Sequence, residues 1–99
     1  MNISITSRHF DASENLKEFS IGSVEKLEQF YDRIVSCDII LEPTSDPKHP
    51  QKAEIIIKVP RKVIAVNEKA ETYEKAISDA VDVATRQIKR YKEKLHAVH

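Results

Sequence analysis

The chain has 99 residues, too few for two separate hydrophobic cores, so we predict a single domain. Hydrophobic residues make up 40% of it and charged residues 32%, which is typical of a folded globular protein and not of a disordered chain. The 16 basic residues balance the 16 acidic ones, which argues against an overall basic nucleic-acid-binding protein, and a single cysteine excludes an internal disulfide.

The cellular compartment is predicted from what the sequence lacks. Residues 1–8 show no charged segment followed by an apolar run, as a signal peptide would have. No apolar run approaches the roughly 20 residues that span a bilayer. A lone cysteine suits a reducing environment. We therefore expect a cytoplasmic protein that does not engage a membrane.

The first third of the chain predicts a strand and then a helix. Isoleucines alternate with polar residues in the segment 2–8, the period of a strand with one buried face. Asp11 and Ser13 can each cap a helix N-terminus, and Glu14 follows Asp11 in the spacing of a capping box. We expect the helix to continue to about Tyr31. Its predicted apolar stripe consists of Leu16, Phe19, Val24, Leu27, Phe30 and Tyr31.

The middle of the chain predicts three more strands. Apolar side chains recur at every second position of residues 35–42 and 53–59, with Ile40 and Ile56 as additional apolar residues on the outer side. The segment 43–50 between them holds three prolines and is predicted to be a loop. A tight turn at 60–61 leads to a strand at 62–69, whose register is ambiguous because four consecutive residues are apolar or small. The predicted inward-facing residues are Val35, Cys37, Ile39 and Leu41, then Ala53, Ile55, Ile57 and Val59.

A long helix is predicted for residues 72–95, with Thr72 as its N-cap. The segment contains no Gly or Pro. Its apolar stripe comprises Tyr73, Ile77, Ala80, Ala84, Ile88, Tyr91 and Leu95. Its opposite side carries Lys75, Arg86, Lys89, Arg90 and Lys94. Residues 85–95 hold five bases and one acid, whereas residues 11–33 hold six acids and three bases, so the neutral total conceals separated charges.

The order β-α-β-β-β-α predicts an α+β fold. Charged side chains on the outer face of each strand indicate a sheet covered on one side only, and each helix has a single apolar stripe. Both helices should therefore lie on one face of a four-stranded mixed sheet, in a two-layer sandwich. A right-handed crossover through the first helix would make the first two strands parallel neighbours.

Few residues suggest catalysis or metal binding. The chain has one glycine, which excludes a glycine-rich phosphate loop. Cys37 alternates with core residues and is expected to pack, not to react. His96 and His99 have metal-ligand spacing, but no third ligand lies nearby in sequence, so a solvated terminus is the simpler interpretation. We predict no enzymatic activity, no metal and no cofactor.

The basic end of the long helix allows three interpretations. Lysine and arginine in the last turns of a helix stabilise its negative end and keep a surface soluble. A basic amphipathic helix can also lie on a membrane, although here the sheet needs the apolar face. The third interpretation is a binding surface for a polyanion. Composition alone does not decide between the first interpretation and the third.

Three segments resemble the ribosome hibernation promoting factors, a family that includes the ribosome-associated inhibitor proteins and is also labelled sigma-54 modulation proteins. The segments are Thr6-Ser7-Arg8-His9, the run from Lys26 to Ile34 (KLEQFYDRI), and the run from Arg86 to Leu95 (RQIKRYKEKL). The resemblance covers essentially the whole chain and implies a fold like that of double-stranded RNA-binding domains.

The resemblance implies a non-enzymatic factor of stationary phase or stress that binds the small ribosomal subunit where mRNA and tRNA would lie, inhibits translation and stabilises idle ribosomes. It further implies that basic residues of both helices contact rRNA backbone, that no small-molecule substrate is bound and that the free protein is a monomer. The rRNA-binding residues predicted by matching positions are Arg8, Lys26, Arg33, Arg86, Lys89, Arg90, Lys92 and Lys94.

The chain departs from the family pattern in places. Thr6-Ser7-Arg8 replaces the usual Thr-Gly-Arg, Pro60-Arg61 replaces a glycine or asparagine turn, and Glu71-Thr72-Tyr73 opens the last helix. The length corresponds to the short form, without the dimer-forming second domain of long members. Two alternatives remain: a generic double-stranded RNA-binding module, and a protein-interaction or transcription-modulating module.

Overall fold

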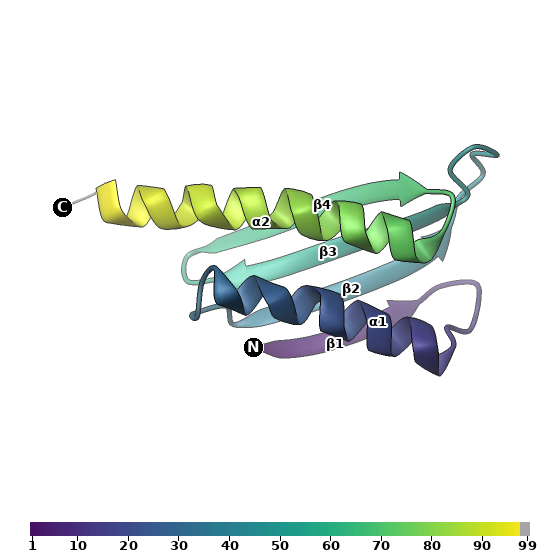
Figure 1. Ribbon diagram of the computed structural model, residues 1–99, viewed down its shortest axis with the longest axis horizontal. Helices are drawn as coiled ribbons and strands as arrows, with labels where there is room; N and C mark the ends of the chain where they lie inside the picture. The colour runs from purple at the N-terminus through teal and green to yellow at the C-terminus, as the bar shows by residue number, and fades with distance from the viewer. Residues whose placement is uncertain (98–99) are drawn as a thin grey trace.

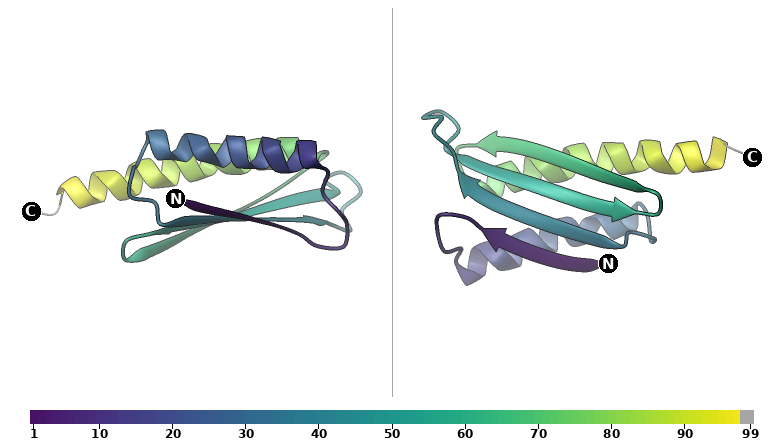
Figure 2. Two further views of the ribbon diagram at one scale, coloured as in Figure 1. Left: turned by 90° about the horizontal axis from the view of Figure 1, so that it is seen from below. Right: turned by 180° about the vertical axis from the view of Figure 1, so that it is seen from behind.

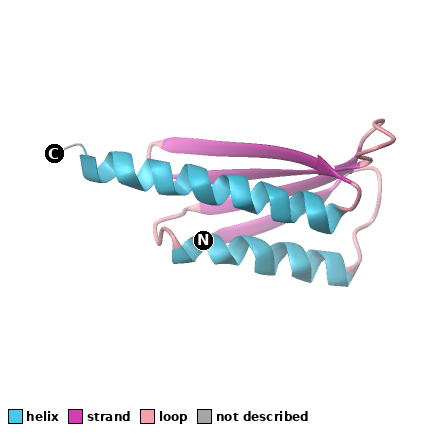
Figure 3. Ribbon diagram, turned by 45° about the horizontal axis from the view of Figure 1, so that its top comes forward, coloured by secondary structure: helices cyan, strands magenta, loops and turns pink. Residues whose placement is uncertain are grey.

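Four strands form one mixed sheet, and both helices lie against the same face of it (Figure 2). This computed structural model describes residues 1–97. Its elements are β1 (Asn2–Ser7), α1 (Glu14–Glu25), the 3-10 helix η1 (Lys26–Gln29), β2 (Ser36–Pro43), β3 (Gln51–Val59), β4 (Lys62–Ala70) and α2 (Tyr73–Ala97), as labelled in Figure 1. The strand order is β1-β2-β3-β4, with β1 parallel to β2 and the other neighbours antiparallel. The predicted two-layer α+β sandwich is confirmed (Figure 3).

The core lies between the sheet and α2. Alternate residues of β2 and β3 point toward the helices, and the register places Cys37 opposite Ile57 and Ile39 opposite Ile55. All four side chains are fully buried. Helix α2 contributes Ala76, Ile77, Ala80, Ala84 and Ile88, which are also fully buried. The alanines let the helix lie close to the sheet, and the isoleucines fill the space beside them.

The first helix begins after Ser13, one of the two predicted caps, but ends earlier than predicted. Its N-cap is Ser13, whose hydroxyl oxygen accepts a hydrogen bond from the amide of Leu16 at 3.1 Å. Asp11 therefore does not cap the helix, and the predicted capping box with Glu14 is wrong. The α-helix ends at Glu25 and tightens into η1, instead of continuing to Tyr31.

The predicted apolar stripe of α1 is also wrong at Phe19, whose side chain is 39% exposed. Ser20 and Ser23 face the core in its place. Each serine hydroxyl donates a hydrogen bond of 2.7 Å to the carbonyl four residues earlier, at Leu16 and Phe19 respectively. Because these bonds satisfy the hydroxyls, burying them costs little, and two small side chains allow α1 to pack closely.

The sheet shows which side chains are buried at Val35 and in β4. Val35 precedes β2 and is 55% exposed, although its amide and carbonyl bond to Lys58 and Asn2 at the end of the sheet. In β4 the buried residues include Ile64 and Val66, while Val63 lies on the uncovered face and is 57% exposed. The prediction for Val35 was therefore wrong, and the ambiguous register of β4 is settled.

Helix α2 is fixed at both ends of its contact with the sheet. The hydroxyl of Thr72 accepts a hydrogen bond from the amide of Lys75 at 3.1 Å, which confirms the predicted N-cap. Near the other end, the hydroxyl of Tyr91 donates to the carbonyl of Pro60 at 2.6 Å. Pro60 belongs to the two-residue β3–β4 turn, where Arg61 adopts a φ of 67°. Beyond Tyr91 the helix extends past the sheet, and residues 92–96 are exposed (Figure 1).

Candidate nucleic-acid interface

The last three turns of α2 present a basic surface, which we define as Arg86, Lys89, Arg90, Lys92 and Lys94. All five side chains are exposed. The helical period separates them into two rows, because at roughly 100° per residue Arg90 and Lys92 point about 160° apart. The first row is Arg86, Arg90 and Lys94. Lys89 and Lys92 form the second row, on the flank that faces η1, where Lys89 lies over Phe30.

None of the cations of this surface forms an ion pair with an acid within residues 1–97. Among residues 1–97, the lysines that form ion pairs are Lys17, Lys52, Lys69 and Lys75. None of the eight residues predicted to bind rRNA takes part in an ion pair within that part of the chain. An unpaired ammonium or guanidinium group meets a phosphate without first losing an internal partner, so these charges are available to a polyanion.

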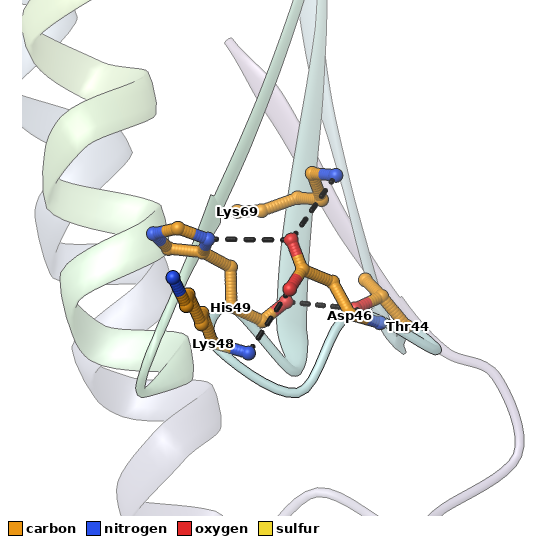
Figure 4. Close-up of polar contacts among 5 residues, drawn as sticks. All are labelled: Thr44, Asp46, Lys48, His49 and Lys69. Atoms are coloured by element: carbon orange, nitrogen blue, oxygen red, sulfur yellow. Dashed lines mark hydrogen bonds and ion pairs between the residues drawn. The ribbon is translucent and has the colours of Figure 1, made fainter.

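In the β2–β3 loop, by contrast, the charged side chains are paired with one another (Figure 4). Asp46 lies 3.3 Å from the Nδ1 atom of His49 and 3.8 Å from the Nζ atom of Lys69, and its carboxylate accepts a hydrogen bond from the amide of Lys48 at 2.9 Å. The bond from the Lys48 amide, followed by the contact with His49, lowers the pKa of Asp46. Thr44 completes the loop by donating to the carbonyl of His49 at 2.7 Å. These polar groups hold the loop in shape.

A cationic groove separates the basic surface from η1. We define it by its lining residues, Gln29, Phe30, Lys89, Lys92, Glu93 and His96. The Nζ atom of Lys89 lies 4.8 Å from the centre of the Phe30 ring. The adjoining hollow is lined by Arg33 and Lys92 together with the acids Glu28 and Asp32, so the fold brings Arg33 beside the basic surface.

Two predicted residues lie apart from this cluster. Arg8 follows β1, and its amide bonds to the carbonyl of Leu41 at 2.9 Å, at the end of the sheet where α2 begins. There Phe10 stacks on Tyr73 with ring centroids 4.6 Å apart, which gives Tyr73 a packing role. Lys26 is exposed at the start of η1 and lines neither hollow.

The fold adds one cation that was not predicted. Arg61 lies in the β3–β4 turn, next to the carbonyl of Pro60 that anchors Tyr91. Burial, and after it the neighbouring Tyr31, raises the pKa of Tyr91, while the positive charge of Arg61 acts in the opposite direction. Arg61 therefore lies near the base of the extended helix end. The sequence signal was a basic residue in a hairpin turn, but only the packing of α2 shows what that turn adjoins.

The described residues show neither a metal-binding group of side chains nor a helix that could cross a membrane. No group of three His, Cys, Asp or Glu side chains among residues 1–97 is arranged to hold a metal ion. Of the suggested pair, His96 lines the cationic groove and His99 lies outside the described residues. No helix in the described part is both long and apolar enough to cross a bilayer.

Cys37 is the core residue that was predicted, and it is fully buried in β2. Burial, with a contribution from Asp38, raises the pKa of its thiol from 9.0 to about 12. We expect iodoacetamide at pH 8 to leave the native chain unmodified and to alkylate Cys37 in urea, as mass spectrometry would show. Because the folded-state pKa is raised, this thiol stabilises the fold below about pH 9 and loses that effect as the pH rises toward 12. Rapid alkylation of the native chain would contradict a buried thiol.

Comparison with known proteins gives consistent matches over nearly the whole chain. A family model described as sigma 54 modulation protein / S30EA ribosomal protein matches residues 3–96. The ribosome hibernation promoting factor of Pseudomonas putida is 26% identical over 94 residues, which cover 95% of this chain and 89% of that protein. The factor of the same name from Escherichia coli K12 is 27% identical over 95 residues, covering 96% and 97%.

Two solved structures share the fold. The N-terminal domain of Thermus thermophilus Protein Y superimposes with a TM-score of 0.81 at 23% identity, covering 92% of this chain and 99% of that one. A ribosomal subunit interface protein from Coxiella burnetii gives a TM-score of 0.85 at 19% identity, covering 94% and 99%. At these identities the likeness concerns the fold alone.

Proposed function

Because this chain belongs to the sigma 54 modulation protein / S30EA ribosomal protein family, we propose that it is a ribosome-binding factor that inhibits translation. It occupies the channel of the small subunit that mRNA and tRNA otherwise fill, and it stabilises idle ribosomes in stationary phase or stress. The names of its relatives from Pseudomonas putida and Escherichia coli support a role in ribosome hibernation. We further propose that it acts in the cytoplasm, as a monomer when free.

The observation that supports this proposal is the basic surface of α2, whose five cations form no ion pair within residues 1–97. Five cations within nine residues of α2, with Arg33 across the hollow, can neutralise several phosphates. Phosphate contacts supply affinity but little sequence information. Specificity would then come from the fit of the whole domain to one folded rRNA pocket.

The proposed mechanism is exclusion and needs no catalysis. A domain that fills the channel prevents mRNA and tRNA from binding there, and it is displaced when they bind more tightly. Such an inhibitor must bind reversibly. Electrostatic contacts with phosphates make its affinity sensitive to ionic strength. The protein's own residues therefore act only as binding groups.

Co-sedimentation with small ribosomal subunits at a series of salt concentrations tests the proposal. We expect the logarithm of the association constant to fall linearly with the logarithm of the salt concentration, with a slope that reflects several phosphates. Subunits already loaded with mRNA and tRNA should not bind the protein. A flat salt response would contradict an rRNA-backbone interface.

A competing RNA duplex separates this function from the alternatives. An excess of arbitrary duplex should leave the protein on the subunit, whereas equal competition would indicate a generic double-stranded RNA binder. Retention of a protein partner from the extract after nuclease treatment would instead favour an interaction or transcription-modulating module.

A further inference from the structure

We propose that Phe30 is a stacking platform for one unpaired base of ribosomal RNA, with Lys89 and Lys92 binding phosphate of the same strand. This inference rests on the proposed function and specifies part of the RNA that the site recognises. The site is the cationic groove between η1 and α2, where an aromatic ring is flanked by cations.

The backbone that carries the Phe30 ring is held in place by local contacts. Phe30 is the C-cap of η1, and its amide donates to the carbonyl of Leu27 at 3.0 Å. Leu27 is fully buried and anchors this turn to the core. Phe30 itself is only partly buried, so part of its ring lines the groove. A partly buried ring on a fixed backbone offers a flat apolar surface at a reduced entropic cost.

Lys89 lies over the face of the Phe30 ring that we expect the base to take. Its Nζ atom lies over the Phe30 ring, 4.8 Å from the centroid, and it has no acidic partner within residues 1–97. A cation over an exposed ring is weakly held, and a nucleobase stacked on an aromatic ring is held more strongly. We expect the base to take the ring face while the ammonium group moves to the adjacent phosphate.

The remaining lining residues suit a nucleotide. Lys92 adds a second positive charge, against the single acid Glu93, so the groove is net cationic and complements a phosphate. Gln29 and His96 also line the groove, and their side chains can hydrogen-bond to a base edge. An unpaired base fits this set better than a duplex does, because bases inside a duplex are stacked on one another and cannot stack on a side chain.

The absence of tryptophan from the chain permits a direct test. In the Phe30→Trp variant the only indole lies at the proposed platform. The control is Phe19→Trp, which places the indole on α1 at a side chain that is 39% exposed. The probes are an eight-nucleotide oligouridylate and an abasic oligomer of the same length and charge. We expect saturable quenching of the indole at position 30 by the oligouridylate only, and no quenching at position 19.

Small-subunit binding provides the second readout. Phe30→Leu keeps an apolar side chain but removes the aromatic face, and it should weaken binding about tenfold, while Phe30→Tyr should bind like the parent. Equal urea midpoints would show that all variants are folded. If Phe30→Leu binds like the parent and position 30 is not quenched, the stacking inference is overturned and the proposed function stands. If the parent itself fails to co-sediment with small subunits, both are overturned.

Discussion

Replacing Arg86, Lys89 and Arg90 together with glutamate is expected to weaken binding to small ribosomal subunits at least about 100-fold at moderate salt. The three exposed side chains have no acidic partner among residues 1–97, so the change removes three free cations and adds three anions that repel phosphate. The salt dependence of the remaining binding should be shallower by about three in slope. Co-sedimentation across a salt series measures both quantities.

The matched control reverses three cations that already have acidic partners. Changing Lys17, Lys69 and Lys75 to glutamate alters the net charge by the same amount, but these lysines pair with Glu14, Asp46 and Asp79. We expect this control variant to bind subunits within a few-fold of the parent. If both triple variants lost binding equally, total charge and not the basic surface would determine affinity. If neither triple variant lost binding, the assignment of the basic surface as the rRNA-binding site would be wrong.

Shortening Ile88 to alanine is expected to lower the free energy of unfolding by about 2–5 kcal/mol. Ile88 is fully buried and lies on the inner face of the same turns of α2 that carry the basic surface. Its removal would leave a cavity between helix and sheet in a domain whose total stability is only about 5–15 kcal/mol. Urea denaturation followed by circular dichroism measures the change.

Leu95→Ala is the control for this substitution on the same helix. Leu95 is 48% exposed and lies beyond Tyr91, where no strand supports the helix. We expect the loss to stay below about 1 kcal/mol, because little apolar surface is uncovered. Equal losses at positions 88 and 95 would mean that the end of α2 is packed against something other than the sheet.

Strand alternation and the helical period of α2 were sufficient to predict the layers of this fold. In β3 the alternate residues Ala53, Ile55, Ile57 and Val59 are buried as predicted, although Ile56 between them is also apolar. The same reasoning failed at α1 because Ser20 and Ser23 satisfy their hydroxyls on carbonyls of their own helix, which lets polar residues occupy the core side. Because serine is polar and phenylalanine apolar, the pattern predicted Phe19 to be buried and the serines to be exposed, and the structure shows the reverse.

The candidate site was only partly predictable for a different reason. The charges on α2 are local in sequence, and their exposure follows from the helical period. Their neighbours depend on tertiary structure. Arg33 and Lys92 line the same hollow because η1 ends beside α2, and Arg61 adjoins Tyr91 because β4 begins under the helix end. Arg8 lies at the other end of the sheet because β1 runs parallel to β2.

The extension of α2 past Tyr91 separates the residues that bind a polyanion from those that stabilise the fold. Residues 92–96 are exposed, so they contribute little to the free energy of folding. Residues on the inner face of the same helix, such as Ile88, contribute a large share of it. Mutations in the overhanging turns can therefore retune affinity for a polyanion over many generations without a stability trade-off, while the buried half of the helix accepts few changes.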